Sequence, residues 1–213
     1  MLRRLCSLLR DKRMAYTYPL QLNFKLIALA PRISVRDASG QSIFYVQQKV
    51  MALKEHVRVF ANEQLQQQLY EIRADRILDF SARYYFRDME GRELGSIKHR
   101  GMRSIWKATY EIYAPGASEP TYKLTEDNPW VKGGDALLSD IPVIGMLTGY
   151  FLHPTYTLSH LQTGSPVLRL RKQPAFFESS FSIEKLDEGL EGEEEIRLLL
   201  AILMAVQLER SRG

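Results

Sequence analysis

The stretch from Leu94 to Tyr110 carries several bases and no acid. Its cationic side chains are Lys98, Arg100, Arg103 and Lys107, with His99 among them. Clustered ammonium and guanidinium groups attract phosphate groups. Trp106 and Met102 lie in the same stretch, and an indole ring favours the boundary between apolar and wet surroundings. The pattern predicts a surface that binds the anionic headgroups of lipids.

A second interpretation of the same stretch stays open. The four bases can be the solvent face of two strands, paired with acids that folding brings near them. A smaller basic cluster, formed by Arg169, Arg171 and Lys172, follows later in the chain. Both clusters need a structure to show which bases lie side by side.

Residue patterns for other chemistry are sparse. His56, His99, His153 and His160 show no close metal-ligand spacing, so structural or surface roles are expected for them. The sequence lacks nucleophile-elbow, phosphate-loop and dinucleotide-binding motifs. We therefore expect a protein that is not an enzyme and needs no cofactor or metal. A site assembled from residues far apart in the sequence would escape this reasoning.

An acidic stretch from Asp187 to Glu195 allows two interpretations. Its carboxylates can bind calcium, but their spacing lacks the order of an EF-hand loop. Alternatively, Glu193, Glu194 and Glu195 stabilise the positive end of the helix dipole in the first turn of a following helix. We favour the second interpretation.

The excess positive charge is confined to the first residues. Residues 1–14 hold five bases and one acid, a balance of 5 − 1 = +4 that equals the net charge of the whole 213-residue chain. We predict a basic N-terminal tail over residues 1–14 and a single domain over 15–213. A neutral domain is not expected to take nucleic acid as its main partner. The single cysteine, Cys6, favours a cytoplasmic protein, and the basic tail adds the option of peripheral attachment to a membrane.

Apolar and polar residues alternate through most of the chain. The longest alternations run from Tyr16 to Leu26, from Leu78 to Phe86 and from Trp106 to Ile112. A period of two is typical of strands with one buried face. Two R-D-x-x-G segments, 36–40 and 87–91, are 51 residues apart (87 − 36 = 51) and predict tight hairpins with a glycine at positive φ, which hints at a weak internal duplication.

The last apolar segment predicts a helix over about 193–209. Its apolar residues run round the whole circumference, whereas a helix on a protein surface shows one apolar stripe. It is too short to span a bilayer, and so is the apolar segment from Ile141 to Leu152. A helix of this kind must be enclosed, and a closed barrel of ten to twelve antiparallel strands is wide enough to hold it. We expect no transmembrane span.

The order of these elements carries a resemblance. The many strands, the R-D-x-x-G hairpins, the segment Trp106 to Tyr113 and the terminal apolar helix resemble the LURP-one-related and phospholipid-scramblase-like branch of the tubby C-terminal-like superfamily. The resemblance covers about residues 16–209. It implies a mainly β fold, a closed barrel of twelve antiparallel strands around the hydrophobic C-terminal helix. It also implies lipid or phosphoinositide binding, because tubby proteins bind phosphoinositides through surface basic residues and scramblases are linked to lipid movement and calcium.

Two functions follow from the sequence and the resemblance together. The first is a non-enzymatic module that binds anionic membrane lipid through Lys98, Arg100, Arg103 and Lys107. The second is a protein-interaction or nucleic-acid-associated scaffold of the tubby-like type. The oligomeric state is not indicated by any pattern in the sequence.

Overall fold

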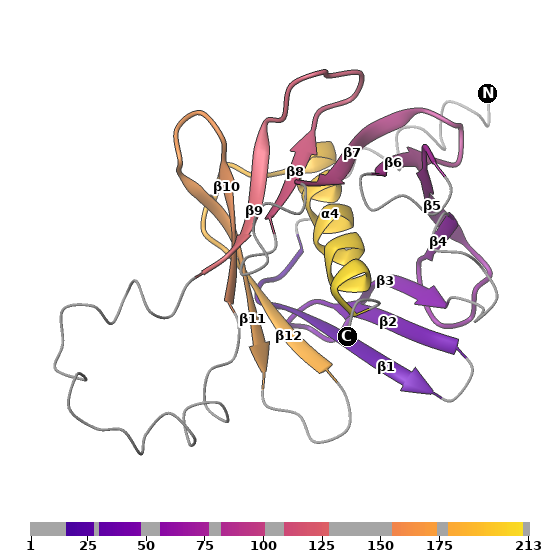
Figure 1. Cartoon of the computed structure of the whole chain (residues 1–213). Helices are drawn as coiled ribbons and strands as arrows, with labels where there is room; N and C mark the ends of the chain where they lie inside the picture. Colours follow the sequence, from indigo (N-terminus) through magenta and orange to yellow (C-terminus); the bar gives the residue numbers. More distant parts are fainter. Residues whose placement is uncertain are drawn as a thin grey trace, which may run out of the picture.

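The protein is a closed β-barrel with a helix along its axis (Figure 1). The computed structural model describes residues 16–27, 30–47, 56–76, 82–100, 109–127, 155–173 and 179–210. Within these residues there are twelve strands and one helix. In chain order they are β1 (Leu20–Ile27), β2 (Ala30–Arg36), β3 (Ser42–Gln47), β4 (His56–Phe60), β5 (Gln68–Ala74), β6 (Arg83–Asp88), β7 (Glu93–His99), β8 (Thr109–Tyr113), β9 (Tyr122–Glu126), β10 (Thr155–His160), β11 (Pro166–Gln173), β12 (Ser179–Lys185) and α4 (Gly192–Arg210).

Each strand pairs antiparallel with its neighbours in sequence, and β1 pairs with β12 to close the barrel. Each described strand therefore has a partner on both sides, although β3 and β4 share only the pair Tyr45 and Phe60. The predicted fold class, a closed barrel of about twelve antiparallel strands around a hydrophobic C-terminal helix, is confirmed. The predicted tail over residues 1–14 and the apolar segment 141–152 lie outside the described residues.

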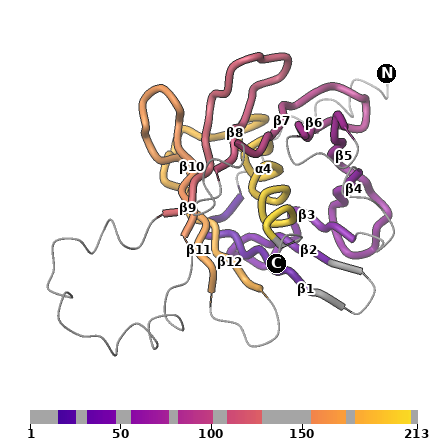
Figure 2. Tube along the Cα trace, in the orientation of Figure 1, coloured from indigo at the N-terminus to yellow at the C-terminus, as the bar shows by residue number. Residues whose placement is uncertain are grey.

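α4 runs through the interior of the barrel (Figure 2), and its side chains form one hydrophobic core with those of the strands. Every residue from Leu198 to Val206 is at most 5% exposed, so the helix is buried on all sides. The inner faces of the strands surround it, with Leu20 and Leu22 on β1 and Ile183 on β12 all fully or almost fully buried. Burying a large apolar side chain contributes about 1.5–3 kcal/mol, so this shared core is the main source of stability.

The two R-D-x-x-G segments form hairpins of the same construction. Asp37 Oδ1 accepts hydrogen bonds from the backbone amides of Ser39 and Gln41, both at 2.9 Å. Asp88 Oδ1 accepts them from the amides two and four residues later, at 3.1 and 2.9 Å. Gly40 and Gly91 have φ values of 85° and 81°. In this conformation glycine carries no steric penalty.

The strand register of these hairpins also repeats. In the first, Val35 pairs with Phe44, and the register then shifts so that the next residue pairs with Ser42. In the second, Phe86 pairs with Gly95, and the same shift follows. Each position differs by 51 residues between the hairpins (86 − 35 = 51), as in the sequence pattern. The paired residues themselves differ: Val35 and Phe44 in the first hairpin correspond to Phe86 and Gly95 in the second.

Gly95 makes room for a polar side chain of the helix. Arg197 of α4 donates a hydrogen bond from Nε to the carbonyl oxygen of Leu94, at 2.7 Å. A Cβ on Gly95 would lie 2.7 Å from Arg197 Cδ and 2.5 Å from the carbonyl oxygen of Tyr113. The glycine therefore lets the arginine reach the backbone of β7 inside the barrel wall.

We expect the Asp37 loop to make the stability of the protein depend on pH. Hydrogen bonds from the Ser39 hydroxyl and from backbone amides lower the pKa of Asp37 below its usual range. A lowered pKa in the folded state stabilises the protein above the unfolded pKa of about 4, and this contribution is lost as the pH falls. Asp37→Ala should therefore melt well below the wild type at pH 7, with a gap that narrows toward pH 3. Thermal melts across this pH range measure the gap, and a constant gap would contradict the assignment.

Candidate functional site

The outer face of β7 holds two of the predicted headgroup-binding bases. Gly95 and Ile97 face α4, so Lys98 lies on the opposite, solvent side of the strand. Arg100 follows directly after β7, and its side chain is 70% exposed. The other two predicted residues, Arg103 and Lys107, lie outside the described residues, as does Trp106.

An acid does lie beside this pair of bases. Arg100 Nε is 3.4 Å from Glu111 Oε1 on β8. Glu111 is also in register with Lys98. A surface ion pair of this kind contributes little to stability and leaves most of the guanidinium in solvent. The second interpretation of the stretch from Leu94 to Tyr110 was that folding brings acids close to its bases. This is the case for Arg100.

Neighbouring strands add two bases that the sequence analysis did not connect with this surface. The register places Arg83 of β6 next to Lys98. It places Lys123 of β9 next to Glu111. The row across four strands is thus Arg83, Lys98, Glu111 and Lys123, three bases and one acid. Residues up to 40 positions apart (123 − 83 = 40) form this row, which only strand pairing can reveal.

Arg83 is held in place by its surroundings. Its guanidinium lies over the ring of Tyr113, 3.8 Å from the centroid. Its Nε donates to Ser96 Oγ at 2.8 Å, and Nη2 donates to the carbonyl oxygen of Ala117 at 2.8 Å. Such stacking and hydrogen bonding fix the position of the cation. Arg83 is therefore the rigid end of the row, and Arg100 is its most exposed neighbour.

Tyr113 connects the fixed arginine with the acid. Its hydroxyl donates a hydrogen bond to Glu111 Oε2 at 2.9 Å. Burial and the Glu111 carboxylate raise the pKa of Tyr113 to about 12, although Arg83 acts in the opposite direction. The phenol therefore remains protonated at neutral pH and continues to hold the Glu111 carboxylate.

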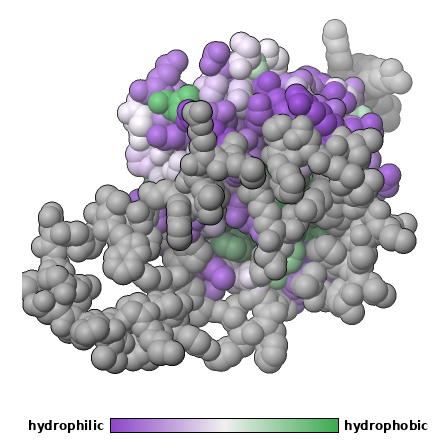
Figure 3. Space-filling view, in the orientation of Figure 1, coloured by the Kyte–Doolittle hydropathy of each residue, from purple (hydrophilic) through white to green (hydrophobic). Residues whose placement is uncertain are grey.

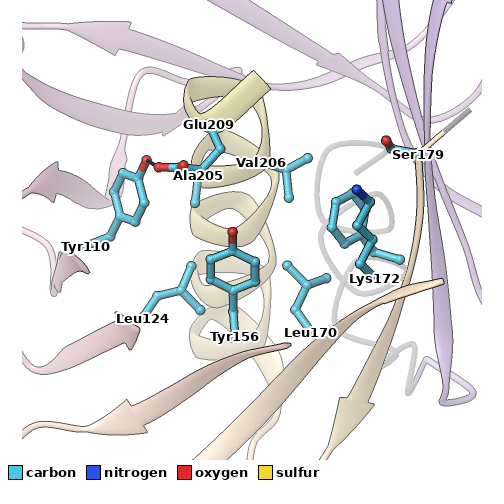
Figure 4. Close-up of a pocket in the computed structure, with 10 residues that line it drawn as sticks. Tyr110, Leu124, Tyr156, Leu170, Lys172, Ser179, Ala205, Val206 and Glu209 are labelled. Atoms are coloured by element: carbon cyan, nitrogen blue, oxygen red, sulfur yellow. Dashed lines mark hydrogen bonds between the residues drawn. The ribbon is translucent and has the colours of Figure 1, made fainter. Parts of the chain in front are cut away.

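A cavity of about 140 Å³ lies between the last turns of α4 and the inner wall of β8 to β12 (Figure 4). Its lining is mostly apolar, with a few polar atoms from side chains near the end of the barrel where α4 ends. The lining residues are Tyr110, Leu124, Tyr156, Leu170, Lys172, Ser179, Phe181, Ala205, Val206 and Glu209. An apolar pocket with a few convergent polar groups is the usual form of a small-molecule site.

Two bases of the smaller basic cluster, Arg171 and Lys172, lie on opposite sides of the barrel wall. Lys172 continues the inward series of Leu168 and Leu170 and lines the cavity. Arg171 points to the outside, where its Nε lies 3.5 Å from Glu184 Oε1. The interpretation of Arg169, Arg171 and Lys172 as one cluster was therefore wrong, because adjacent strand residues face opposite sides.

The acids at the start of α4 each have a donor or a cation as partner. Glu195, only 4% exposed, accepts a hydrogen bond from the Tyr18 hydroxyl at 3.0 Å. Glu194 Oε1 accepts one from Tyr122 at 2.8 Å, and Glu193 Oε1 one from Arg92 at 2.5 Å. Among the described residues no group of three or more histidine, cysteine, aspartate or glutamate side chains could hold a metal ion.

The described histidines lie in ordinary structural contacts. His99 stacks edge-on against Tyr110, and His160 does so against Tyr122, each at 5.1 Å between ring centroids. His56 Nε2 is 3.3 Å from Glu71 Oε2. His153 lies outside the described residues. In the part of the chain that the structure covers, no helix is both long and apolar enough to cross a membrane.

A twelve-stranded barrel closed around a hydrophobic helix is the architecture of the tubby-like superfamily, to which the LURP-one-related family belongs. The chain matches the model of the LURP-one-related family over residues 42–183, and it is a member of that family. A comparison with curated proteins gives no match. Among solved structures, the chain is similar to a protein from Arabidopsis thaliana determined by X-ray crystallography, with 12% sequence identity and a TM-score of 0.46 over 90% of this chain and 93% of that one.

Proposed function

We propose that the protein is a non-enzymatic module that binds anionic membrane lipid, phosphoinositides included, through the basic surface of Lys98, Arg100, Arg103 and Lys107. The observation that carries this proposal is the row of three bases and one acid across β6 to β9, with Arg100 exposed beside it. A cation near an anionic bilayer contributes about 1 kcal/mol of attraction. Several together give weak, salt-sensitive attachment at the membrane surface.

The position of these bases supports contact with a membrane surface. Lys98 and Arg100 project from the outside of a closed wall whose inner side packs against α4. The part of the molecular face that is coloured in Figure 3 is largely hydrophilic. Headgroups can therefore approach these cations without entering the barrel. The protein would then be cytoplasmic and attach peripherally to the membrane.

Sedimentation with liposomes tests this proposal. We expect the protein to sediment with vesicles that contain phosphatidylserine and a phosphoinositide, and to remain in solution with phosphatidylcholine vesicles. Arg100→Glu should lower the partition coefficient about thirtyfold, because it removes one attractive charge and adds a repulsive one, each worth about 1 kcal/mol. Arg100→Glu combined with Arg103→Glu should abolish sedimentation. Raising the ionic strength should weaken it as well.

Arg36→Glu is the matched control. Arg36 is exposed and lies 3.2 Å from an acid, Glu63, as Arg100 lies close to Glu111, but it is at the opposite end of the barrel. The proposal requires that Arg36→Glu leave sedimentation unchanged. Equal losses in both variants would show a general charge effect.

Binding to duplex DNA with a steep salt dependence, together with no binding to vesicles, would replace the lipid module with the nucleic-acid-associated scaffold.

A further inference from the structure

The cavity at the end of α4 is independent of the basic surface. It lies inside the barrel wall, whereas Lys98 and Arg100 lie outside it. Leu124, Leu170 and Val206 supply much of its apolar lining. An engineered apolar cavity of about 150 Å³ in another protein holds a benzene molecule. The cavity here, at about 140 Å³, is thus large enough for one ring or a short branched chain.

Lys172 is an inward-facing cation at this cavity. It is half-buried and follows Leu168 and Leu170 on the inner face of β11. In the part of the chain that the structure covers, no acid lies within ion-pair distance of its ammonium group. A carboxylate bound at this wall would therefore meet a cation that it can pair with by a charge-assisted hydrogen bond.

Tyr156, which pairs with Leu170 on the neighbouring strand, supplies a hydrogen-bond donor to the same cavity. Figure 4 shows its ring between Leu124 and Leu170, with the hydroxyl pointing up the view into the space between Ala205 and Val206. Within the described residues no side chain or backbone group accepts a hydrogen bond from this hydroxyl. Burial is the main cause that raises the pKa of Tyr156 above its usual range, and Glu126 and Glu209 add to it, so the phenol is a donor at neutral pH.

The acids around the cavity limit where an anion can lie. Glu209 Oε1 already accepts a hydrogen bond from the Tyr110 hydroxyl at 2.5 Å. In Figure 4 this pair is on one side of Tyr156, and Lys172 is on the other. A negative group would be repelled on the side of Glu209 and attracted on the side of Lys172.

We propose that the cavity binds a compact carboxylate with an apolar body, whose carboxylate accepts hydrogen bonds from Lys172 Nζ and the Tyr156 hydroxyl. The apolar body lies against Leu124, Leu170 and Val206. A molecule with one aromatic ring and one carboxylate has the size and polarity that this lining requires. The inference does not rest on lipid binding by the outer surface.

NMR titration of the full chain with three ring compounds of similar size tests the proposal. Benzoate carries a carboxylate, benzyl alcohol a neutral hydroxyl and benzylamine a cation. We expect benzoate to shift the methyl resonances of Leu124, Leu170 and Val206 and to bind about tenfold more tightly than benzyl alcohol, because a hydrogen bond to a charged group is the stronger kind. Benzylamine should bind most weakly. Ligands of this size bind weakly, so the titrations extend to about 10 mM.

Substitutions at Lys172 and Tyr156 test whether these two side chains bind the carboxylate. Lys172→Met retains the length of the side chain and should reduce the affinity for benzoate about tenfold, to that of benzyl alcohol. Tyr156→Phe should reduce it severalfold. Arg171→Met, at the adjacent position on the outer face of β11, is the control and should bind benzoate like the wild type. Absence of shifts at the three cavity residues, or equal affinity of the wild type and Lys172→Met for benzoate, would overturn the proposal. Liposome sedimentation of Lys172→Met should remain normal, which separates this site from the outer surface.

Discussion

Replacing Leu200 with glutamate is expected to leave no folded protein. Leu200 is fully buried at the middle of α4, and strands surround the helix on every side. The substitution removes a core side chain at a cost of about 2–5 kcal/mol and buries a carboxylate without a partner at several kcal/mol more. The sum approaches or exceeds the whole stability of a typical domain, about 5–15 kcal/mol. Expression yield and a thermal melt by circular dichroism measure the outcome.

Two other variants show whether position 200 itself is responsible. Leu200→Met conserves volume and should cost less than about 1.5 kcal/mol. Met89→Glu introduces the same acid at a side chain that is 51% exposed in the β6–β7 turn, and should melt like the wild type. A soluble Leu200→Glu protein with a cooperative melt near that of the wild type would contradict the enclosed position of α4.

Gly95→Ala should be the most damaging glycine-to-alanine change among the glycines that the structure describes. The added Cβ would lie 2.5 Å from the carbonyl oxygen of Tyr113 and 2.7 Å from Arg197 Cδ, at a backbone φ of 139°. Strain at this φ and overpacking together should lower the free energy of unfolding by about 2–5 kcal/mol. Gly91→Ala is the control, because its Cβ would meet no atom within 4 Å at a φ of 81°, and it should cost about 1–2 kcal/mol.

A double-mutant cycle separates the two contacts of Gly95. Arg197→Ala removes the Cγ and Cδ atoms that a Cβ at position 95 would meet, but it leaves the Tyr113 carbonyl in place. We expect the double variant to be more stable than the sum of the single effects predicts, by about 0.5–3 kcal/mol. Urea unfolding curves provide the values. If Gly95→Ala costs no more than Gly91→Ala, Arg197 does not need the space beside β7.

The alternation of apolar residues and the apolar circumference of the helix together predicted a barrel, and the family resemblance implied its twelve strands. Leu20, Leu22 and Phe24 are buried as the period of two requires, and α4 is buried all round, as its apolar circumference requires. Both properties depend on which side of an element a residue faces, and this is fixed locally by backbone geometry. The enclosing strands then follow from the need to cover the helix.

The candidate sites were only partly predictable, because cross-strand neighbours are not encoded by local spacing. Lys98 and Arg100 lie on one face because they are two residues apart. Lys123 joins them only through the pairing of β8 with β9, and Lys172 is separated from Arg171 by the strand period. The cavity combines five strands and α4, so no local motif indicates it.

The pairing of β1 with β12, which closes the barrel, has a consequence for how the chain folds. All strand pairs except β1–β12 join neighbours in the chain, so eleven of the twelve pairings can form locally. If the barrel closed first, the 19-residue helix α4 would have to enter it past the side chains that point into its interior. α4 must therefore pack against the curved sheet before β1 pairs with β12. Closure of the barrel and burial of α4 are therefore one event, in which β1, β12 and α4 take part together.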